Sequence, residues 1–399
     1  MRNASRKVNI TEYIIIILFG KCHSECGISS LAIPSTSPLA SAMDYDSNNT
    51  GFPDYDNGSD ANTMLKVAVY INNYYLWVIF AVGFPGNIAS VITIFRMQRV
   101  TTSTFYVAVL AVTDCCAIVF KLTYHQLTLH EVTLDSVGCK MLNFFMLNFA
   151  TCANWILVCI TTERFVAVRN PLKVGMYWTV PRAVFSVATI GCVVALFYCH
   201  ILWTYTGSGI YCTIHAQYIH FFRNVWYWMD AVVYSIGPCV ILTTLNCFII
   251  HSVKQSTTLR NQLSMKRKQK KTSSGTIKQD AQITMMLISV SIVFVILTVP
   301  RCIFVIINLY WEVKLGTIED AQKYLMDQLT FILCDSTHAI NFYLYFITGK
   351  KFRNNFLDMV LCRKPRMLSR NLSQSGTTVT MQTKYKSNSL DEGQTEDEI

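Results

Sequence analysis

Four charged residues stand inside long apolar stretches of the sequence, where they can form ion pairs or bind charged groups of a ligand. They are Lys121, Asp230, Arg301 and Asp335. Arg301 follows Pro300 directly within the apolar run 291–311. An unpaired charge in an apolar medium is costly, so we expect Arg301 to point into the protein and to find a carboxylate. The sequence shows neither a nucleophile–base pair nor metal-ligand spacing, and we therefore expect no enzymatic activity.

These charges belong to apolar runs that have the length of membrane-spanning helices. Of the 399 residues, 52% are hydrophobic and 15% are charged, which is too apolar for an ordinary soluble domain. Seven runs of roughly 20 residues or more have the length that crosses a bilayer as a helix. Their approximate bounds are 71–95, 104–125, 140–168, 182–205, 226–251, 283–310 and 327–348. The sequence therefore predicts an all-α membrane protein, a bundle of seven transmembrane helices.

The distribution of lysine and arginine predicts the orientation of these spans. Neither residue occurs from Ala183 through Phe222, whereas eight fall between Ser252 and Gln282. Basic loops stay in the cytoplasm, so we expect the loop between the fifth and sixth spans inside and the N-terminus outside. The net charge of +10 is therefore a signal of topology, and we expect no nucleic-acid partner.

The N-terminal segment carries glycosylation signals that agree with an extracellular location. Asn48 (N-N-T) and Asn57 (N-G-S) precede the first span and are predicted N-glycosylation sites. Residues 1–42 are either a signal peptide, with Tyr13–Gly20 as its apolar core, or an extension ahead of a start at Met43. The expected organisation is an extracellular tail over 1–69, a seven-helix domain over 70–349, an amphipathic helix over 350–362 and a disordered cytoplasmic tail over 363–399.

Cys139 and Cys212 differ from most of the 15 cysteines, which lie inside the spans. Cys139 opens the third span, and Cys212 lies in the loop after the fourth. Under the predicted orientation both face the oxidising side of the membrane. We therefore expect a disulfide between them.

Polar residues and prolines recur within the runs in a fixed order. The second run contains "LAVTD", the third ends in "ERF", and the seventh ends in "NFYLYFITGKKFR". Over residues 70–362 this pattern resembles the rhodopsin-like (class A) family of G-protein-coupled receptors. The residues that carry the resemblance are Gly86, Asn87, Asp114, Glu163, Arg164, Phe165, Pro171, Leu172, Pro238, Phe294, Pro300, Asn341 and Tyr345.

The resemblance implies how the inner half of the protein works. Arg164 is expected to pair with Asp280 in the inactive state and to release it when the sixth helix swings outward. Leu172 is expected to be the apolar contact for a heterotrimeric G protein. Asp114 and Asn341 correspond to a hydrated sodium site, and a sodium ion is the only cofactor implied. The other positions that the resemblance assigns to activation or coupling are Glu163, Phe165, Pro171, Phe294, Pro300 and Tyr345.

The same resemblance places the charges in an outer ligand pocket. Lys121 and Asp335 become neighbours, and Arg301 stands between the fifth and seventh spans, so the two bases can neutralise Asp335 and Asp230. These charges are either a closed network that holds the helices together or groups that bind an acidic and a basic part of a peptide. The expected lining beside them is Tyr124, His125, Met146 and Trp226.

Departures from the family pattern bear on the ligand. Thr298, Phe342 and Asn246 replace a tryptophan, a proline and a tyrosine that are usual in the family. Asn341-Phe342 with Tyr345 resembles invertebrate receptors for short neuropeptides, of the FMRFamide and myosuppressin kind. The alternatives are a chemosensory or other small-molecule receptor and, from a different class, a transporter or channel.

The C-terminal region is expected to act at the inner membrane surface. Residues 350–362 predict a short helix that lies on the lipid bilayer, with Cys362 at its end as a palmitoylation site. The Ser/Thr-rich tail over 363–399 predicts contacts with receptor kinases and arrestin. Under this reading the chain is a multi-pass protein of the plasma membrane with an extracellular N-terminus.

Overall fold

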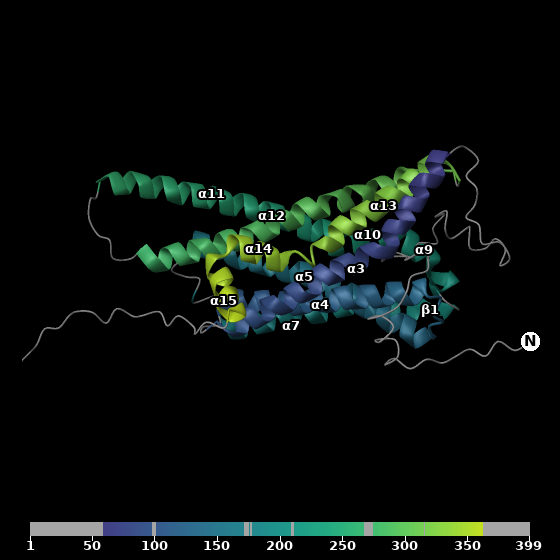
Figure 1. Ribbon diagram of the computed structural model, residues 1–399, viewed down its shortest axis with the longest axis horizontal. Coiled ribbons are helices and arrows are strands. Elements are labelled where there is room, and N and C mark those ends of the chain that lie inside the picture. Colours follow the sequence, from purple (N-terminus) through teal and green to yellow (C-terminus); the bar gives the residue numbers. More distant parts are fainter. Residues whose placement is uncertain are drawn as a thin grey trace, which may run out of the picture.

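The computed structural model describes residues 59–97, 101–170, 175, 178–208, 211–266, 274–314 and 316–361. Figure 1 shows long helices that run along the longest axis of the molecule and pack into one bundle. The first four spans are α3 (Ser59–Phe95), α4 (Thr102–Leu129), α5 (Ser136–Arg169) and α7 (Val180–Tyr198), the last followed by α8 (Ile201–Thr204). The fifth span joins α9 (Ile219–Phe221), η2 (Phe222–Trp226), α10 (Tyr227–Ala231), η3 (Val232–Ile236) and α11 (Gly237–Lys266). The remaining helices are α12 (Ser274–Tyr310), α13 (Ile318–Ser336), α14 (Asn341–Thr348) and α15 (Lys350–Val360).

The predicted bundle of seven transmembrane helices is confirmed, although its last span has an unusual form. Within the described residues, six helical segments are long and apolar enough to cross a membrane by length and composition. The seventh span is divided between α13 and α14, with a break over residues 337–340. Acidic residues such as Asp327 and Asp335 lower the hydropathy of α13. The same acidic residues belong to the charged pocket described below.

The first span begins earlier than its apolar run predicts. Helix α3 starts at Ser59, so the boundary expected at residue 70 lies inside a helix. Leu65 and Ala68 share one face of this extension and pack with Ala321 and Tyr324 of α13. The first and last spans therefore stabilise each other beyond the apolar runs, and this contact explains why the helix starts early.

The two ends of the bundle carry different structures (Figure 1). At one end, β1 (Tyr205–Ser208) and β2 (Tyr211–Ile214) form an antiparallel pair that packs on α5. At the other end, α15 follows α14, and Phe352 of α15 packs on Phe342 and Tyr345. The helix predicted from residue 350 is therefore present, and its apolar face contacts the inner end of the bundle.

Candidate functional site

Lys121 and Asp335 form an ion pair between α4 and α13, in line with the neighbouring positions that the family resemblance implies. Their side chains are only 11% and 5% exposed. The Lys121 ammonium also donates a hydrogen bond to the Tyr234 hydroxyl (3.2 Å), and the Tyr75 hydroxyl donates to Asp335 Oδ2 (3.5 Å). Spans one, two, five and seven are thus joined by one buried polar cluster.

Arg301 does not pair with either carboxylate that the sequence analysis offers. Its Nη1 lies 2.6 Å from Oδ1 of Asp327, and its guanidinium stacks 3.5 Å from the ring centre of Phe331. Asp327 is 32% exposed, so this ion pair borders solvent. The sequence could have predicted Asp327 as a pocket residue from its spacing to Asp335. Asp327 precedes Asp335 by about two helical turns and so projects from a similar side of α13.

Asp230 stands apart from both ion pairs, and the expected network of two acids and two bases is therefore wrong. Within the described residues it accepts a hydrogen bond from the Tyr198 hydroxyl (2.8 Å) and forms no ion pair. Tyr198 also shares a hydrogen bond with Thr151 of α5 (2.9 Å). The physical reason is that Asp327 is the direct partner of Arg301, so the Tyr198 hydroxyl is the hydrogen-bond partner that Asp230 keeps.

Three of the four predicted pocket-lining residues come together near the disulfide. Tyr124, Met146 and Trp226 are buried in one apolar cluster at the outer end of the bundle. His125 is also buried, but its ring lies against Tyr75, with the ring centres 6.4 Å apart. His125 thus belongs to the Lys121–Asp335 side of the bundle rather than to the Trp226 side.

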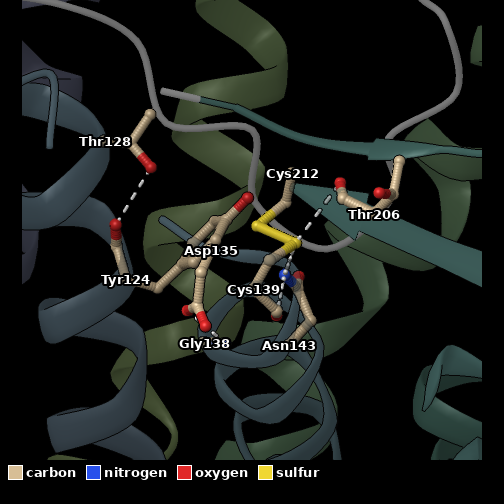
Figure 2. Close-up of a disulfide and its surroundings, with 8 residues drawn as sticks. All are labelled: Tyr124, Thr128, Asp135, Gly138, Cys139, Asn143, Thr206 and Cys212. Carbon is tan, nitrogen blue, oxygen red and sulfur yellow. Dashed lines mark hydrogen bonds between the residues drawn. A yellow bond between two sulfur atoms is a disulfide. The ribbon is translucent and has the colours of Figure 1, made fainter. Parts of the chain in front are cut away.

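The predicted disulfide is present and fixes the outer hairpin to α5. Figure 2 shows Cys139 joined to Cys212 of β2, with Cα atoms 5.6 Å apart. Asp135 caps the start of α5 by accepting a hydrogen bond from the Gly138 amide (2.9 Å). A side chain at Gly207 of β1 would place its Cβ 2.6 Å from the backbone oxygen of Leu134, in the segment before α5, so only glycine allows this close approach. The hairpin is therefore fixed against the outer end of α5.

Asp114 and Asn341 lie together in the bundle, as the resemblance implies. Asn341 Nδ2 donates to Asp114 Oδ2 (2.8 Å), and Nδ1 of His338 lies 2.8 Å from Asp114 Oδ1. A carboxylate oxygen has two acceptor sites, and each oxygen here carries one contact of this kind. The sodium ion that the resemblance implies therefore stays a prediction.

Arg164 is held at the inner end by two neighbours. It pairs with Glu163 (2.9 Å) and donates a hydrogen bond to the Ser103 hydroxyl, which in turn donates to Glu163 (3.1 Å). Phe165 packs near Phe248 of α11, with ring centres 6.1 Å apart. The sequence analysis did not predict the contact with Ser103, because a single serine in α4 does not indicate which residue of another helix it bonds. The side chain of Asp280 and the residues Asn48, Asn57, Pro171, Leu172 and Cys362 lie outside the described part of the structure.

The sixth helix carries the remaining predicted positions. Phe294 is buried in the inner core, and Pro300 lies within the continuous helix α12. Tyr345 of α14 is 1% exposed in the same core. A contact that the sequence does not predict joins α12 to α11, where the Ser291 hydroxyl donates to Asn246 Oδ1 (2.8 Å). This hydrogen bond holds the helix whose outward movement the family resemblance assigns to activation.

Ser291→Ala is expected to raise ligand-free signalling by about 2- to 10-fold, because a hydrogen bond of this kind contributes about 0.5–1.5 kcal/mol. The measurement is basal calcium and cyclic-AMP output at matched surface amounts. Ser289→Ala is the control, since the Ser289 hydroxyl bonds only a carbonyl of its own helix among the described residues. Equal basal output from both variants would show that the Asn246 contact does not restrain α12.

Comparison with known proteins identifies the family. The family model described as "7 transmembrane receptor (rhodopsin family)" matches residues 86–345, which is more than half of the chain. The chain belongs to this family. It is therefore a G-protein-coupled receptor and a multi-pass protein of the plasma membrane, and its partners are a ligand and a G protein.

Three similar receptors come from invertebrates. A "probable G-protein coupled receptor" of Caenorhabditis elegans is 22% identical over 84% of this chain and 80% of its own length. The "sex peptide receptor-related protein 2" of the same species is 22% identical over 52% of this chain and 51% of its own length. The "FMRFamide receptor" of Drosophila melanogaster is 25% identical over 54% of this chain and 38% of its own length. The chain therefore spans about half or less of the two relatives whose names mention a peptide.

Proposed function

We propose that this receptor binds a short extracellular neuropeptide in the outer half of its bundle. The observation that carries the proposal is the arrangement of Arg301 and Asp327, an ion pair that is buried on the arginine side and 32% exposed on the aspartate side. Solvent reaches Asp327, so an acidic group of a peptide can compete for the guanidinium. Charges of both signs beside aromatic side chains suit a peptide better than an apolar small molecule.

Sequence relationships support a peptide over a small ligand. The names of two relatives mention an FMRFamide and a sex peptide. Asn341-Phe342 and Tyr345 resemble receptors for FMRFamide and myosuppressin, and all three residues lie in the inner part of the seventh span. The similarity is distant, so it supports the class of ligand and leaves its sequence open.

The proposed signal passes from the outer pocket to the G protein through α12. Arg301 connects α12 to α13, and Ser291 connects the inner half of α12 to α11. A ligand that displaces Asp327 biases α12 toward a second position, and Arg164 then becomes available to the G protein. In this proposal the N-terminus is extracellular, and receptor kinases and arrestin act on the C-terminal tail.

The test is a screen of short amidated neuropeptides on cells that express the full chain, with calcium and cyclic AMP as readouts. Arg301→Ala is expected to lower the potency of an active peptide about tenfold or more, as seen for desolvated charge pairs. Its surface amount should stay near wild type, because water can hydrate the exposed Asp327.

Lys323→Ala is a matched control, since Lys323 donates to carbonyls near the end of α12 and lies in the same region of α13. Retention of Arg301→Ala inside the cell would indicate that the ion pair only holds the helices together. Silence of wild-type receptor at the cell surface across the whole library would count against a peptide and favour a small-molecule ligand.

A further inference from the structure

Asp230 is a buried acidic residue that forms no ion pair within the described part of the chain. Lys121 is neutralised by Asp335, and Arg301 by Asp327. Asp230 is 5% exposed, and its partner among the described residues is the neutral hydroxyl of Tyr198. A buried carboxylate is costly without a cation, so this position calls for a positive group that the two ion pairs do not supply.

The backbone around Asp230 points to function as well. Asp230 lies in α10, one short helix between two π-helical turns, η2 (Phe222–Trp226) and η3 (Val232–Ile236). Each π turn widens the helix and rotates the residues between the two turns relative to the rest of the span. Such turns carry an energetic cost and occur frequently at functional sites. The fifth span is thus irregular where it presents Asp230.

Two aromatic residues, Tyr198 and Trp226, lie near this carboxylate. Trp226 precedes Asp230 by one turn, is 5% exposed, and has its ring centre 5.9 Å from that of Tyr198. Tyr198 is the last residue of α7, next to the segment that leads into the disulfide-linked hairpin. Asp230 therefore lies toward the outer end of the bundle. Aromatic faces attract cations, so the rings and the carboxylate favour the same kind of ligand group.

From the buried carboxylate without an ion pair, the irregular helix and the aromatic neighbours, we infer that Asp230 binds a guanidinium or ammonium group of the ligand. The inference rests on the proposed ligand pocket and adds its chemistry: the ligand is cationic at the end that contacts the fifth span.

The first test uses small probes on the purified full-length receptor. Nα-acetyl-L-argininamide is expected to raise the midpoint of thermal unfolding by about 2 °C at saturating concentration, whereas Nα-acetyl-L-citrullinamide, which carries no charge, is not. Asp230→Asn should abolish this difference. Tyr198→Phe, which removes the hydroxyl partner and keeps the carboxylate, should preserve it, and so should Asp230→Glu.

Equal effects of the two amides on the wild-type receptor would overturn the inference, even if Asp230→Asn failed to fold. A preference for argininamide that survives in Asp230→Asn would also overturn it.

A second test separates this inference from the proposed peptide function. Peptide pairs that differ by arginine or citrulline are applied to cells that express the wild-type receptor or Asp230→Asn. The arginine peptide should be about tenfold or more potent on wild type and should lose that advantage on the variant. A peptide response without an arginine preference would support the peptide function and overturn the cation site at Asp230. An argininamide effect without any peptide response would support the cation site and contradict the peptide function.

Discussion

Asp335→Asn is expected to remove most of the folded receptor from the cell surface. The change leaves the ammonium of Lys121 without a counter-charge in a place where the lysine side chain is 11% exposed. Loss of one partner of a buried ion pair costs about 3–5 kcal/mol, a large share of the stability of a folded domain. The hydroxyl of Tyr234 remains as a partner for Lys121, but a neutral hydroxyl does not replace the lost charge.

The measurement is surface labelling together with the midpoint of thermal unfolding of the purified receptor. The double variant Lys121→Met with Asp335→Asn should recover much of the loss, because neither charge then remains buried. Arg301→Ala is the control: the charge left behind is the carboxylate of Asp327, which is 32% exposed and can be hydrated by water, so the loss should be smaller. If Asp335→Asn kept normal surface amounts and an unchanged midpoint, the charge of Lys121 would have to be hydrated by water in place of Asp335.

The sequence predicts the spans well because hydropathy is a local property. Each of the seven apolar runs overlaps one helix or several consecutive helical segments in the structure. The start of α3 at Ser59 was missed, because it depends on packing against Ala321 and Tyr324, which are distant in sequence. The break in the seventh span was missed for the same reason. Asn87 of α3 donates to the carbonyl of His338 within that break (2.8 Å), and no local pattern predicts this contact.

For the pocket, the sequence identifies which charges are buried but not how they pair. Apolar surroundings alone predict that Lys121, Asp230, Arg301 and Asp335 lie inside the protein, and all four are less than a tenth exposed or close to it. The pairing depends on how each helix is rotated about its axis and on rotamers of long side chains. Asp327 was overlooked because it lies at the edge of an apolar run, where exposed acidic residues are common. Its exposure of 32% agrees with that position.

At the inner end of the bundle, too, the sequence identifies the important residue but not its contacts. The resemblance assigns Arg164 its role, whereas the hydroxyl of Ser103, on another helix, depends on the three-dimensional structure. Nε of Arg164 has no hydrogen-bond partner among the described residues. The guanidinium therefore keeps donor capacity for another group while Glu163 and Ser103 hold its other end.

Arg164→Ala is expected to abolish ligand-stimulated signalling while much of the receptor still reaches the cell surface. In the proposed mechanism the guanidinium is the group that α12 releases to the G protein, so its removal takes away the contact itself. Glu163, whose side chain is 4% exposed, loses its cation and keeps only the Ser103 hydroxyl as a donor (3.1 Å), so the surface amount should fall in part. The measurement is the maximal calcium or cyclic-AMP response to an active peptide, scaled to surface receptor.

Arg164→Lys separates charge from geometry in the same assay. Lysine keeps the positive charge but lacks the planar fork of donors that contacts two groups at once, so it should restore only part of the maximal response. Glu163→Gln gives the opposite change, since it weakens the hold on Arg164 (2.9 Å) and should raise ligand-free output. A full response from Arg164→Ala at normal surface amounts would contradict the proposed role of Arg164, because a residue that couples α12 to the G protein cannot be dispensable for coupling.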